Sequence, residues 1–170
     1  LELTEREREI LPVLRPAGII LFRHNFSSTD LQHSALRLIA EVRSLTNRED
    51  LLVSIDHEGG RVHRLYPPAS HFPAASTWGE RTAEVALAMG CELREVGVNL
   101  SFAPVVDILS EPTNTVIGPR AFGVDPDTVA RRGVEFFNAT EKAGVVACAK
   151  HFPGHGGTQG DSHFELPILE

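Results

Sequence analysis

The chain has 170 residues, which is long enough for one domain with a substantial hydrophobic core. It is 42% hydrophobic and 23% charged, an ordinary composition for a globular protein, and its formal net charge is −7 without a basic block. That charge argues against nucleic acid as the main partner, and no apolar run approaches the roughly 20 residues of a membrane-spanning helix. Neither an initiator Met nor a signal peptide opens the chain, so we expect a piece of a longer protein.

The first part of the chain predicts a helix, a strand and a second helix. Residues 3–16 predict a helix, because Thr4 and Glu7 have the spacing of a capping box. The short apolar run 17–22 predicts a buried strand. Residues 28–47 predict an amphipathic helix, since their apolar side chains recur near helical spacing.

The same alternation continues through the rest of the chain. Residues 51–56 predict a second buried strand, and a helix follows over roughly 78–96 after a loop rich in Gly and Pro. The segment 98–108 is expected to start as a third strand. Residues 126–144 predict a helix, and residues 145–152 predict a fourth strand.

This succession of strands and helices predicts an α/β protein with a parallel sheet. Four such units would make part of a TIM (β/α)₈ barrel, and a complete small doubly wound sheet is the alternative. Both folds place their functional residues just past the carboxyl ends of the strands. Four polar residues occupy such positions here: Asp56, Asp107, Lys150 and His151.

The segment DHEGGRVHR, residues 56–64, gathers two carboxylates and two arginines around a Gly-Gly turn. Glycines let the backbone come close to a ligand. Asp56 at a strand end can accept two sugar hydroxyls, and an arginine donates hydrogen bonds in a fixed fork. The alternative is a loop with a local salt bridge.

Asp107 and Arg120 are two further candidate residues. Asp107 follows the apolar run of SFAPVVDI, and a carboxylate so close to a core strand is costly to bury unpaired. Its partner could be substrate, Lys150 or Arg120, and a purely structural salt bridge is the alternative. Arg120 lies in the rigid segment IGPRAFG, where it could bind a polar or anionic ligand group or remain solvated.

The segment KHFPGHGGTQGDSH, residues 150–163, contains three histidines, one aspartate, one lysine and four glycines. A metal site is one interpretation, but the H-x₃-H spacing suits zinc only on a helix, and the prolines and glycines here oppose a helix. The second interpretation is a general acid/base pair of Asp161 and His163, in which the carboxylate orients the imidazole. The third is an exposed polar loop. The metal-ligand candidates would be His151, His155, Asp161 and His163.

Four motifs together carry a family resemblance. The segments IDHEGGRVHRL, NLSFAPVVDI, IGPRAFG and KHFPGHGGTQGDSH, in this order and spacing, resemble glycoside hydrolase family 3, and most closely its bacterial β-N-acetylglucosaminidases of cell-wall recycling. The similarity extends along nearly the whole chain and implies a TIM-type (β/α)₈ barrel. Residues 1–170 would be part of a single N-terminal barrel domain and would supply roughly strands 2–5 with their helices. The remainder of the barrel would lie outside this chain.

The resemblance also implies roles for individual residues. This branch of the family uses a His–Asp pair on a mobile loop as acid/base, where most glycosidases use a second carboxylate. His163 would protonate the leaving oxygen and later deprotonate the attacking water, while Asp161 orients His163. His155 would brace the loop turn, and Asp107 would hold the pocket together through Lys150 or a neighbouring arginine. The implied sugar-binding residues are Asp56, Arg64, Arg120, Lys150 and His151.

The implied reaction is hydrolysis, with retention, of terminal non-reducing β-linked N-acetylglucosamine from peptidoglycan fragments. The partner would be the carbohydrate, in which that sugar is β-1,4-linked to anhydro-N-acetylmuramic acid. The resemblance implies no cofactor and no metal, and a cytoplasmic location. His57 stands where a glutamine is common, a change that we expect the fold to tolerate.

The family's nucleophile is an aspartate after a later strand, and no residue of this chain matches that position. We therefore expect these 170 residues to be catalytically incomplete on their own. Four other functions remain open: another family 3 glycosidase such as a β-glucosidase, a β-N-acetylglucosaminide phosphorylase, a non-catalytic sugar-binding half barrel, and a metal-dependent hydrolase. The D-S-H motif disfavours the β-glucosidase.

Overall fold

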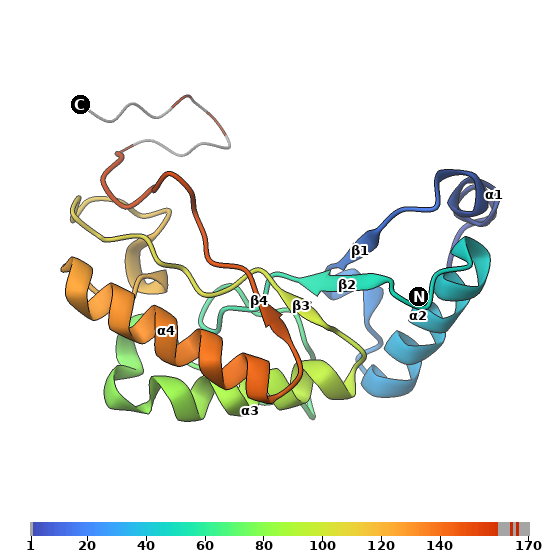
Figure 1. The fold of residues 1–170 in the computed structure, drawn as a ribbon, viewed down its shortest axis with the longest axis horizontal. Helices are drawn as coiled ribbons and strands as arrows, with labels where there is room; N and C mark the ends of the chain where they lie inside the picture. Colours follow the sequence, from blue (N-terminus) through green and yellow to red (C-terminus); the bar gives the residue numbers. More distant parts are fainter. Residues whose placement is uncertain (1, 160–163, 165, 167–170) are drawn as a thin grey trace.

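Four parallel strands form one sheet, in the order in which they occur in the sequence (Figure 1). The structure is a computed structural model that describes residues 2–159, 164 and 166. Each strand pairs with the next in parallel register, so that Ile19 lies opposite Val53 and Leu100 lies opposite Val146. The strands are β1 (Gly18–Leu21), β2 (Leu52–Ile55), β3 (Leu100–Ser101) and β4 (Val146–Ala147).

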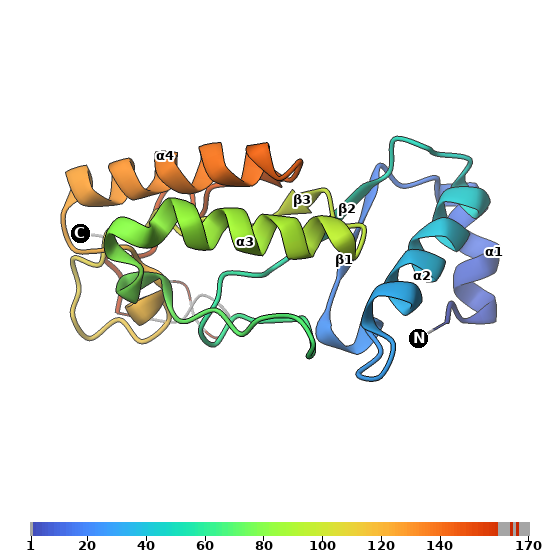
Figure 2. The ribbon, with the colours of Figure 1, turned by 90° about the horizontal axis from the view of Figure 1, so that it is seen from below.

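Each connection between consecutive strands contains one long helix. Helices α2, α3 and α4 lie on the same side of the sheet, and the view from below shows α3 between α4 and the strands' lower connections, with α2 beside β1 (Figure 1 and Figure 2). The helices are α1 (Glu5–Leu14), α2 (Leu31–Thr46), α3 (Thr82–Glu95) and α4 (Pro126–Lys142). Short 3₁₀ turns span Arg23–Asn25, Ala75–Thr77, Gly79–Arg81 and Gly118–Arg120. None of the helices in the described residues is long and apolar enough to cross a membrane.

Sequential strand order with helices on one side is the arrangement of neighbouring units in a (β/α)₈ barrel. A doubly wound sheet reverses its strand order at a switch point and carries helices on both faces. The order β1-β2-β3-β4 therefore confirms the prediction of a partial barrel and excludes the doubly wound alternative.

Local sequence signals account for where the helices begin. The backbone N–H of Glu7 donates to the hydroxyl of Thr4 at 3.2 Å, and the backbone N–H of Thr4 donates to the Glu7 carboxylate at 2.7 Å, so the predicted capping box is confirmed. Helix α4 begins after Asp125, whose carboxylate accepts the backbone N–H of Thr128 at 2.9 Å. The residue after this cap is Pro126, which suits the first position of a helix.

The hydrophobic core lies between the sheet and helices α2, α3 and α4. Apolar side chains from all of these elements are 2% exposed or less, and they include Ile39, Val42, Val53, Ile55, Met89, Leu93 and Phe136. By contrast Ile20, Leu52 and Val146 are 40%, 45% and 53% exposed. Within the described residues the helices thus cover one face of the sheet only, as expected for part of a barrel.

The fourth strand is shorter than predicted, and the third is equally short, because their pairing is interrupted. Strands β3 and β4 have 2 residues each, whereas the sequence predicted that 98–108 starts as a strand and that 145–152 is one. Pro104 has no N–H to contribute to a ladder. Pairing resumes in a single parallel bridge between Val105 and Lys150, in which the backbone N–H of Lys150 donates to Pro104 O at 3.0 Å.

Candidate functional site

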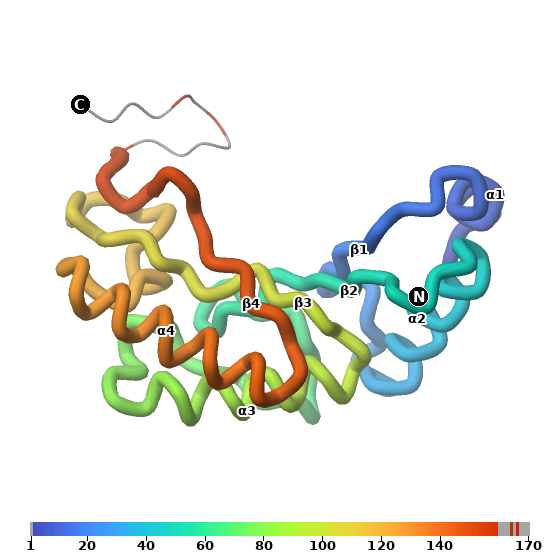
Figure 3. Tube along the Cα trace, in the orientation of Figure 1, coloured from blue at the N-terminus to red at the C-terminus, as the bar shows by residue number. Residues whose placement is uncertain are grey.

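The polar residues that follow the strands meet at one edge of the sheet. Asp56 follows β2 directly, Lys150 forms the bridge that extends β4, and His151 comes directly after it. Asp107 comes two residues after Val105 in the same bridge. The chain after β4 runs beside the chain after β3 (Figure 3), which brings Asp107 and His151 into contact.

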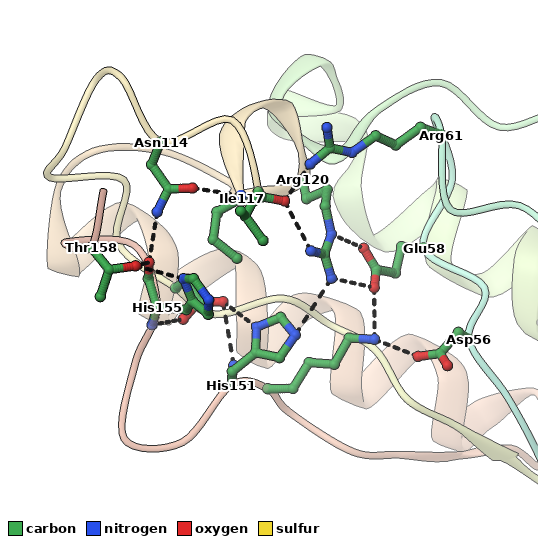
Figure 4. Close-up of polar contacts among 12 residues, drawn as sticks. Asp56, Glu58, Arg61, Asn114, Ile117, Arg120, His151, His155 and Thr158 are labelled. Atoms are coloured by element: carbon green, nitrogen blue, oxygen red, sulfur yellow. Dashed lines mark hydrogen bonds and ion pairs between the residues drawn. The ribbon is translucent and has the colours of Figure 1, made fainter. Parts of the chain in front are cut away.

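A buried carboxylate, Glu58, lies at the centre of this site (Figure 4). The guanidinium of Arg120 donates to both of its oxygens, from Nε at 2.8 Å and from Nη2 at 2.9 Å. Lys150 Nζ lies 2.6 Å from Glu58 Oε1 and 2.6 Å from Asp56 Oδ1. Two carboxylates and two cations from three segments of the chain therefore form one ionic network.

Glu58 is 4% exposed, and its charged form is nevertheless favoured. Burial by itself would raise the pKa of this carboxyl, but the hydrogen bonds and charges of Arg120 and Lys150 outweigh burial and lower it. Sequence reasoning did not single out Glu58. The available signal was its position in the same motif as Asp56, two residues further along the chain.

A tight turn holds Glu58 in place. The backbone N–H of Glu58 donates to Val62 O at 2.8 Å, and Gly59 and Gly60 adopt φ values of 84° and 55°. A Cβ on Gly59 would lie 2.5 Å from the carbonyl oxygen of Pro73. These glycines were expected to let the backbone approach a ligand, but in the structure they let it pack against residues 72–74.

Asp107 binds the two histidines of the KHFPGHGG segment. Its Oδ2 lies 2.5 Å from His151 Nδ1, and its Oδ1 accepts the backbone N–H of His155 at 2.6 Å. We expected Asp107 to contact Lys150 or a neighbouring arginine, and this expectation is wrong: its direct partners are His151 and His155. Burial would raise the pKa of Asp107, but the hydrogen bonds from His151 and His155 lower it overall.

The contacts of His151 fix the position of its ring proton. Its Nε2 lies 3.4 Å from Arg120 Nη2, and an arginine can only donate. Nε2 is therefore the acceptor in this long hydrogen bond, and Nδ1 donates its proton to Asp107. The peptide bond between Lys150 and His151 is cis, and both side chains reach the Glu58–Arg120 pair.

The start of the glycine-rich loop is attached to the segment that carries Arg120. Asn114, which is 3% exposed, donates from Nδ2 to His155 O at 2.7 Å, and its Oδ1 accepts the backbone N–H of Ile117 at 2.8 Å. The side chain of His155 lies 2.7 Å from the hydroxyl of Thr158 through Nδ1. Sequence reasoning missed Asn114, because nothing local marks an asparagine whose two partners lie in different loops.

A cavity of about 420 Å³ opens between residues 106–110 and 149–157, and Asp107, Lys150 and His151 are among its lining residues. The two segments approach each other closely at Gly156, where an added Cβ would lie 1.9 Å from Ile108 O. The polar groups of the site therefore border a space large enough for a small ligand.

One predicted site residue that the structure describes, Arg64, is not brought into the network. Arg64 is half-buried and donates its backbone N–H to His57 Nδ1 at 3.2 Å, but its guanidinium has no hydrogen bond or ion pair within the described residues. Asp161 and His163 lie outside the described residues, so the acid/base pair stays a prediction.

His57 is completely buried and titrates far below the ordinary range of a histidine. Burial lowers its pKa to about 3, with a further contribution from His63 and Arg64. The rings of His57 and His63 lie 4.4 Å apart between centroids, and those of His63 and His71 lie 4.7 Å apart. Among residues 2–159, no group of three or more His, Cys, Asp or Glu side chains is arranged to hold a metal ion.

The model of the family described as "Glycosyl hydrolase family 3 N terminal domain" matches residues 2–170. A β-hexosaminidase of Methylococcus capsulatus is 45% identical over 173 residues, which cover 97% of this chain and 50% of that protein. A β-hexosaminidase of Thioalkalivibrio sulfidiphilus is 43% identical, with 98% of this chain and 50% of that protein covered. The chain thus spans about half the length of these relatives.

Solved structures of family 3 enzymes also superpose closely on this chain. A glycoside hydrolase family 3 β-N-acetylglucosaminidase from Paenibacillus superposes with a TM-score of 0.89 at 38% identity, covering 99% of this chain and 33% of that one. NagZ from Neisseria gonorrhoeae, in complex with N-trifluoroacetyl-D-glucosamine, superposes with a TM-score of 0.85 at 37% identity. That match covers 98% of this chain and 51% of NagZ. By sequence and by structure, this chain belongs to the N-terminal domain of glycosyl hydrolase family 3.

Proposed function

We propose that the full-length protein is a β-N-acetylglucosaminidase that removes terminal non-reducing β-linked N-acetylglucosamine. The observation that carries this proposal is the network of Asp56, Glu58, Arg120, Lys150 and His151 at the carboxyl edge of the sheet. The names of the related enzymes, β-hexosaminidase and β-N-acetylglucosaminidase, point to the same chemistry.

The network offers both kinds of group that a sugar needs. Asp56 is 26% exposed at its side chain and uses only Oδ1 on Lys150, so Oδ2 has no partner among the described residues and can accept sugar hydroxyls. Arg64 brings a guanidinium without a protein partner in that same part of the chain. Sugar hydroxyls both donate and accept hydrogen bonds. A site that supplies acceptors and donors for them disfavours ligands that lack hydroxyls, because its own polar groups would stay unpaired.

In the proposed reaction His163 acts as the acid and then as the base. It gives its proton to the glycosidic oxygen as the C1–O bond breaks and an enzyme carboxylate bonds to C1. It then takes a proton from the water that attacks C1 and releases the carboxylate, so the configuration is retained. Asp161 orients the imidazole and stabilises its charged form. The carboxylate nucleophile is expected from outside these 170 residues, and turnover by the 170-residue chain alone would contradict that expectation.

The proposed substrate is a peptidoglycan fragment in which N-acetylglucosamine is β-1,4-linked to anhydro-N-acetylmuramic acid. Recycling of such fragments would place the protein in the cytoplasm. Its partner would be the carbohydrate, and we expect no nucleic-acid partner.

The acid/base loop begins at residues that the structure holds firmly, since Asp107 and Asn114 both bind the backbone of His155. That attachment suits a loop that must bring His163 back to the same place in each cycle.

The test is hydrolysis of a chromogenic β-N-acetylglucosaminide by the full-length protein. General acid/base catalysis contributes typically 10²–10⁴-fold, so His163→Ala is expected to lower the rate by about that factor, with partial recovery on a substrate with a good leaving group. His33→Ala, a change at a histidine whose side chain is 81% exposed, serves as the matched control. An unchanged rate in His163→Ala would remove the acid/base assignment. Release of the sugar as a 1-phosphate in phosphate buffer would indicate a phosphorylase instead.

A further inference from the structure

Glu58 differs from the other carboxylate of the ionic network in having no free oxygen. Arg120 Nη2 and Lys150 Nζ both contact Oε1, and Arg120 Nε contacts Oε2. Asp56, in contrast, is 26% exposed and contacts Lys150 through one oxygen. The two carboxylates therefore have different tasks: Asp56 can face a ligand, whereas Glu58 is fully engaged by protein cations.

From this difference we propose that Glu58 is a positioning residue, which holds Arg120 and Lys150 in one fixed arrangement and thereby sets the affinity of the sugar site. This inference rests on the proposed function, and it adds a residue that neither binds the sugar nor takes part in the proton transfers. Glu58 acts through the two cations that would donate to the sugar.

The surroundings of Glu58 make its contacts strong. Its side chain is 4% exposed, and a small cavity beside the Glu58–Arg120 pair is walled by the aromatic side chains of Trp78, Phe122 and Phe136. In a site from which water is excluded, ion pairs and charge-assisted hydrogen bonds are stronger than in solvent. Burial also means that losing the carboxylate would leave Arg120 and Lys150 next to each other without the anion between them.

The backbone of Glu58 is also fixed by hydrogen bonds. Glu58 begins a turn, which its backbone N–H closes by donating to Val62 O at 2.8 Å. The backbone N–H of Gly60 then ties this turn to a neighbouring loop by donating to Phe72 O at 2.8 Å. A positioning group is effective when its own place is fixed by packing and hydrogen bonds. The turn supplies that fixation just after β2, the strand that Asp56 follows directly.

The decisive variant is Glu58→Gln in the full-length protein. Glutamine keeps the shape and can accept one hydrogen bond from Arg120, but it presents an N–H group or an uncharged oxygen to Lys150. Charge-assisted hydrogen bonds contribute about 1.5–3 kcal/mol, so the Kd for N-acetylglucosamine measured by calorimetry is expected to rise about 10- to 100-fold. The KM for the chromogenic substrate is expected to rise by a similar factor while kcat changes less, because binding to substrate and transition state is lost alike.

The matched control is Glu80→Gln. Glu80 also pairs with an arginine, Arg132, but its side chain is 83% exposed and lies outside the site. The Glu80→Gln substitution is expected to leave the Kd for N-acetylglucosamine and the KM for the chromogenic substrate unchanged. If Glu58→Gln fails to fold, Glu58→Asp keeps the charge but is too short to reach both cations, and it is expected to raise Kd in the same direction. A folded Glu58 variant with wild-type Kd and KM would overturn the inference.

A second measurement separates this inference from the proposed function. If the wild-type protein neither hydrolyses nor binds N-acetylglucosamine, the proposed function is wrong, and the crystal structure of Glu58→Gln still decides the role of Glu58. In that structure the Arg120 guanidinium and Lys150 Nζ are expected to leave the positions that they hold in the wild-type protein. Unmoved cations would overturn the inference whatever the activity.

Discussion

Asp107 Oδ2 lies 2.5 Å from His151 Nδ1, and this contact joins the two strand ends that carry most of the candidate site. The other oxygen of the same carboxylate accepts the backbone N–H of His155, where the glycine-rich loop begins. One buried side chain thus fixes both a proposed sugar-binding residue and the start of the proposed acid/base loop.

Replacing Asp107 by Asn should therefore reduce activity without removing the side chain's shape. An amide oxygen can still accept one hydrogen bond, but the charge that holds His151 is lost. Hydrogen bonds to charged groups contribute about 1.5–3 kcal/mol, so kcat/KM for a chromogenic β-N-acetylglucosaminide is expected to fall about 10- to 100-fold. Asp50→Asn, at a carboxylate that is 79% exposed, is the control and should keep the wild-type value. Equal kcat/KM values in both variants would contradict a positioning role for Asp107.

Gly156→Ala tests the close approach of the loop to Ile108. The new Cβ would lie 1.9 Å from Ile108 O, so the loop must shift away from the site. Displacement of a reacting group by about 1 Å can lower a rate by about 10²-fold, and we expect a loss of that order in kcat. Gly123→Ala is the control, because its nearest neighbour would be an ordinary 3.5 Å away. A fully active Gly156→Ala variant would mean that the loop tolerates a different path.

Asn114→Ala tests the bridge between the two loops. The substitution removes one donor from His155 O, which still accepts from the hydroxyl of Thr158, and leaves the buried N–H of Ile117 without its partner. Unsatisfied buried groups cost about 1–3 kcal/mol each, so the free energy of unfolding measured with urea is expected to fall by at least about 1 kcal/mol. Thr113→Ala, one residue earlier and exposed, should have a much smaller effect. Similar losses in the two variants would show that the bridge adds little to stability.

His57 should make the protein less stable as the pH falls. Burial lowers its pKa from 6.5 to about 3, so between these values the unfolded chain binds a proton that the folded protein does not. The stabilising contribution is complete above pH 6.5 and is lost progressively toward pH 3. The difference between the two pKa values corresponds to roughly 5 kcal/mol as an upper figure.

The substitution His57→Gln removes this titration and keeps a group that can accept the Arg64 backbone N–H. The thermal midpoint of the variant is expected to fall less than that of the wild type between pH 6.5 and 4. His33→Gln, at an exposed histidine, should follow the wild-type curve. Parallel curves for wild type and His57→Gln would show that His57 is not the group responsible.

The helices were predictable because their signals are local. Residues 126–144 were predicted to be helical and α4 spans Pro126–Lys142, with Asp125 as the cap. The strands were predicted in the right places, but the fourth was predicted too long. Apolar composition marks a segment that can pair, whereas the length of pairing depends on the neighbouring strand, which here contains Pro104 opposite the end of β4.

The gathering of polar residues at one edge of the sheet was predictable for a similar reason. Because the carboxyl ends of parallel strands meet at one edge of a sheet, Asp56, Asp107 and Lys150 could be placed near each other from their positions in the sequence alone. Glu58 and Asn114 were missed, because their roles depend on partners 62 and 41 residues away. The partners of Asp107 were predicted incorrectly for the same reason.

The sequence by itself determined the succession of elements, the helix caps and which polar residues follow the strands, since these follow from short-range hydrogen bonding and hydrophobic periodicity. Only the tertiary structure decided which charges pair. A carboxylate such as Glu58 can bind any cation within reach, and the reach is set by the sheet order and by the turn at Gly59 and Gly60. Ion pairing depends on distance and burial, and both are properties of the folded chain.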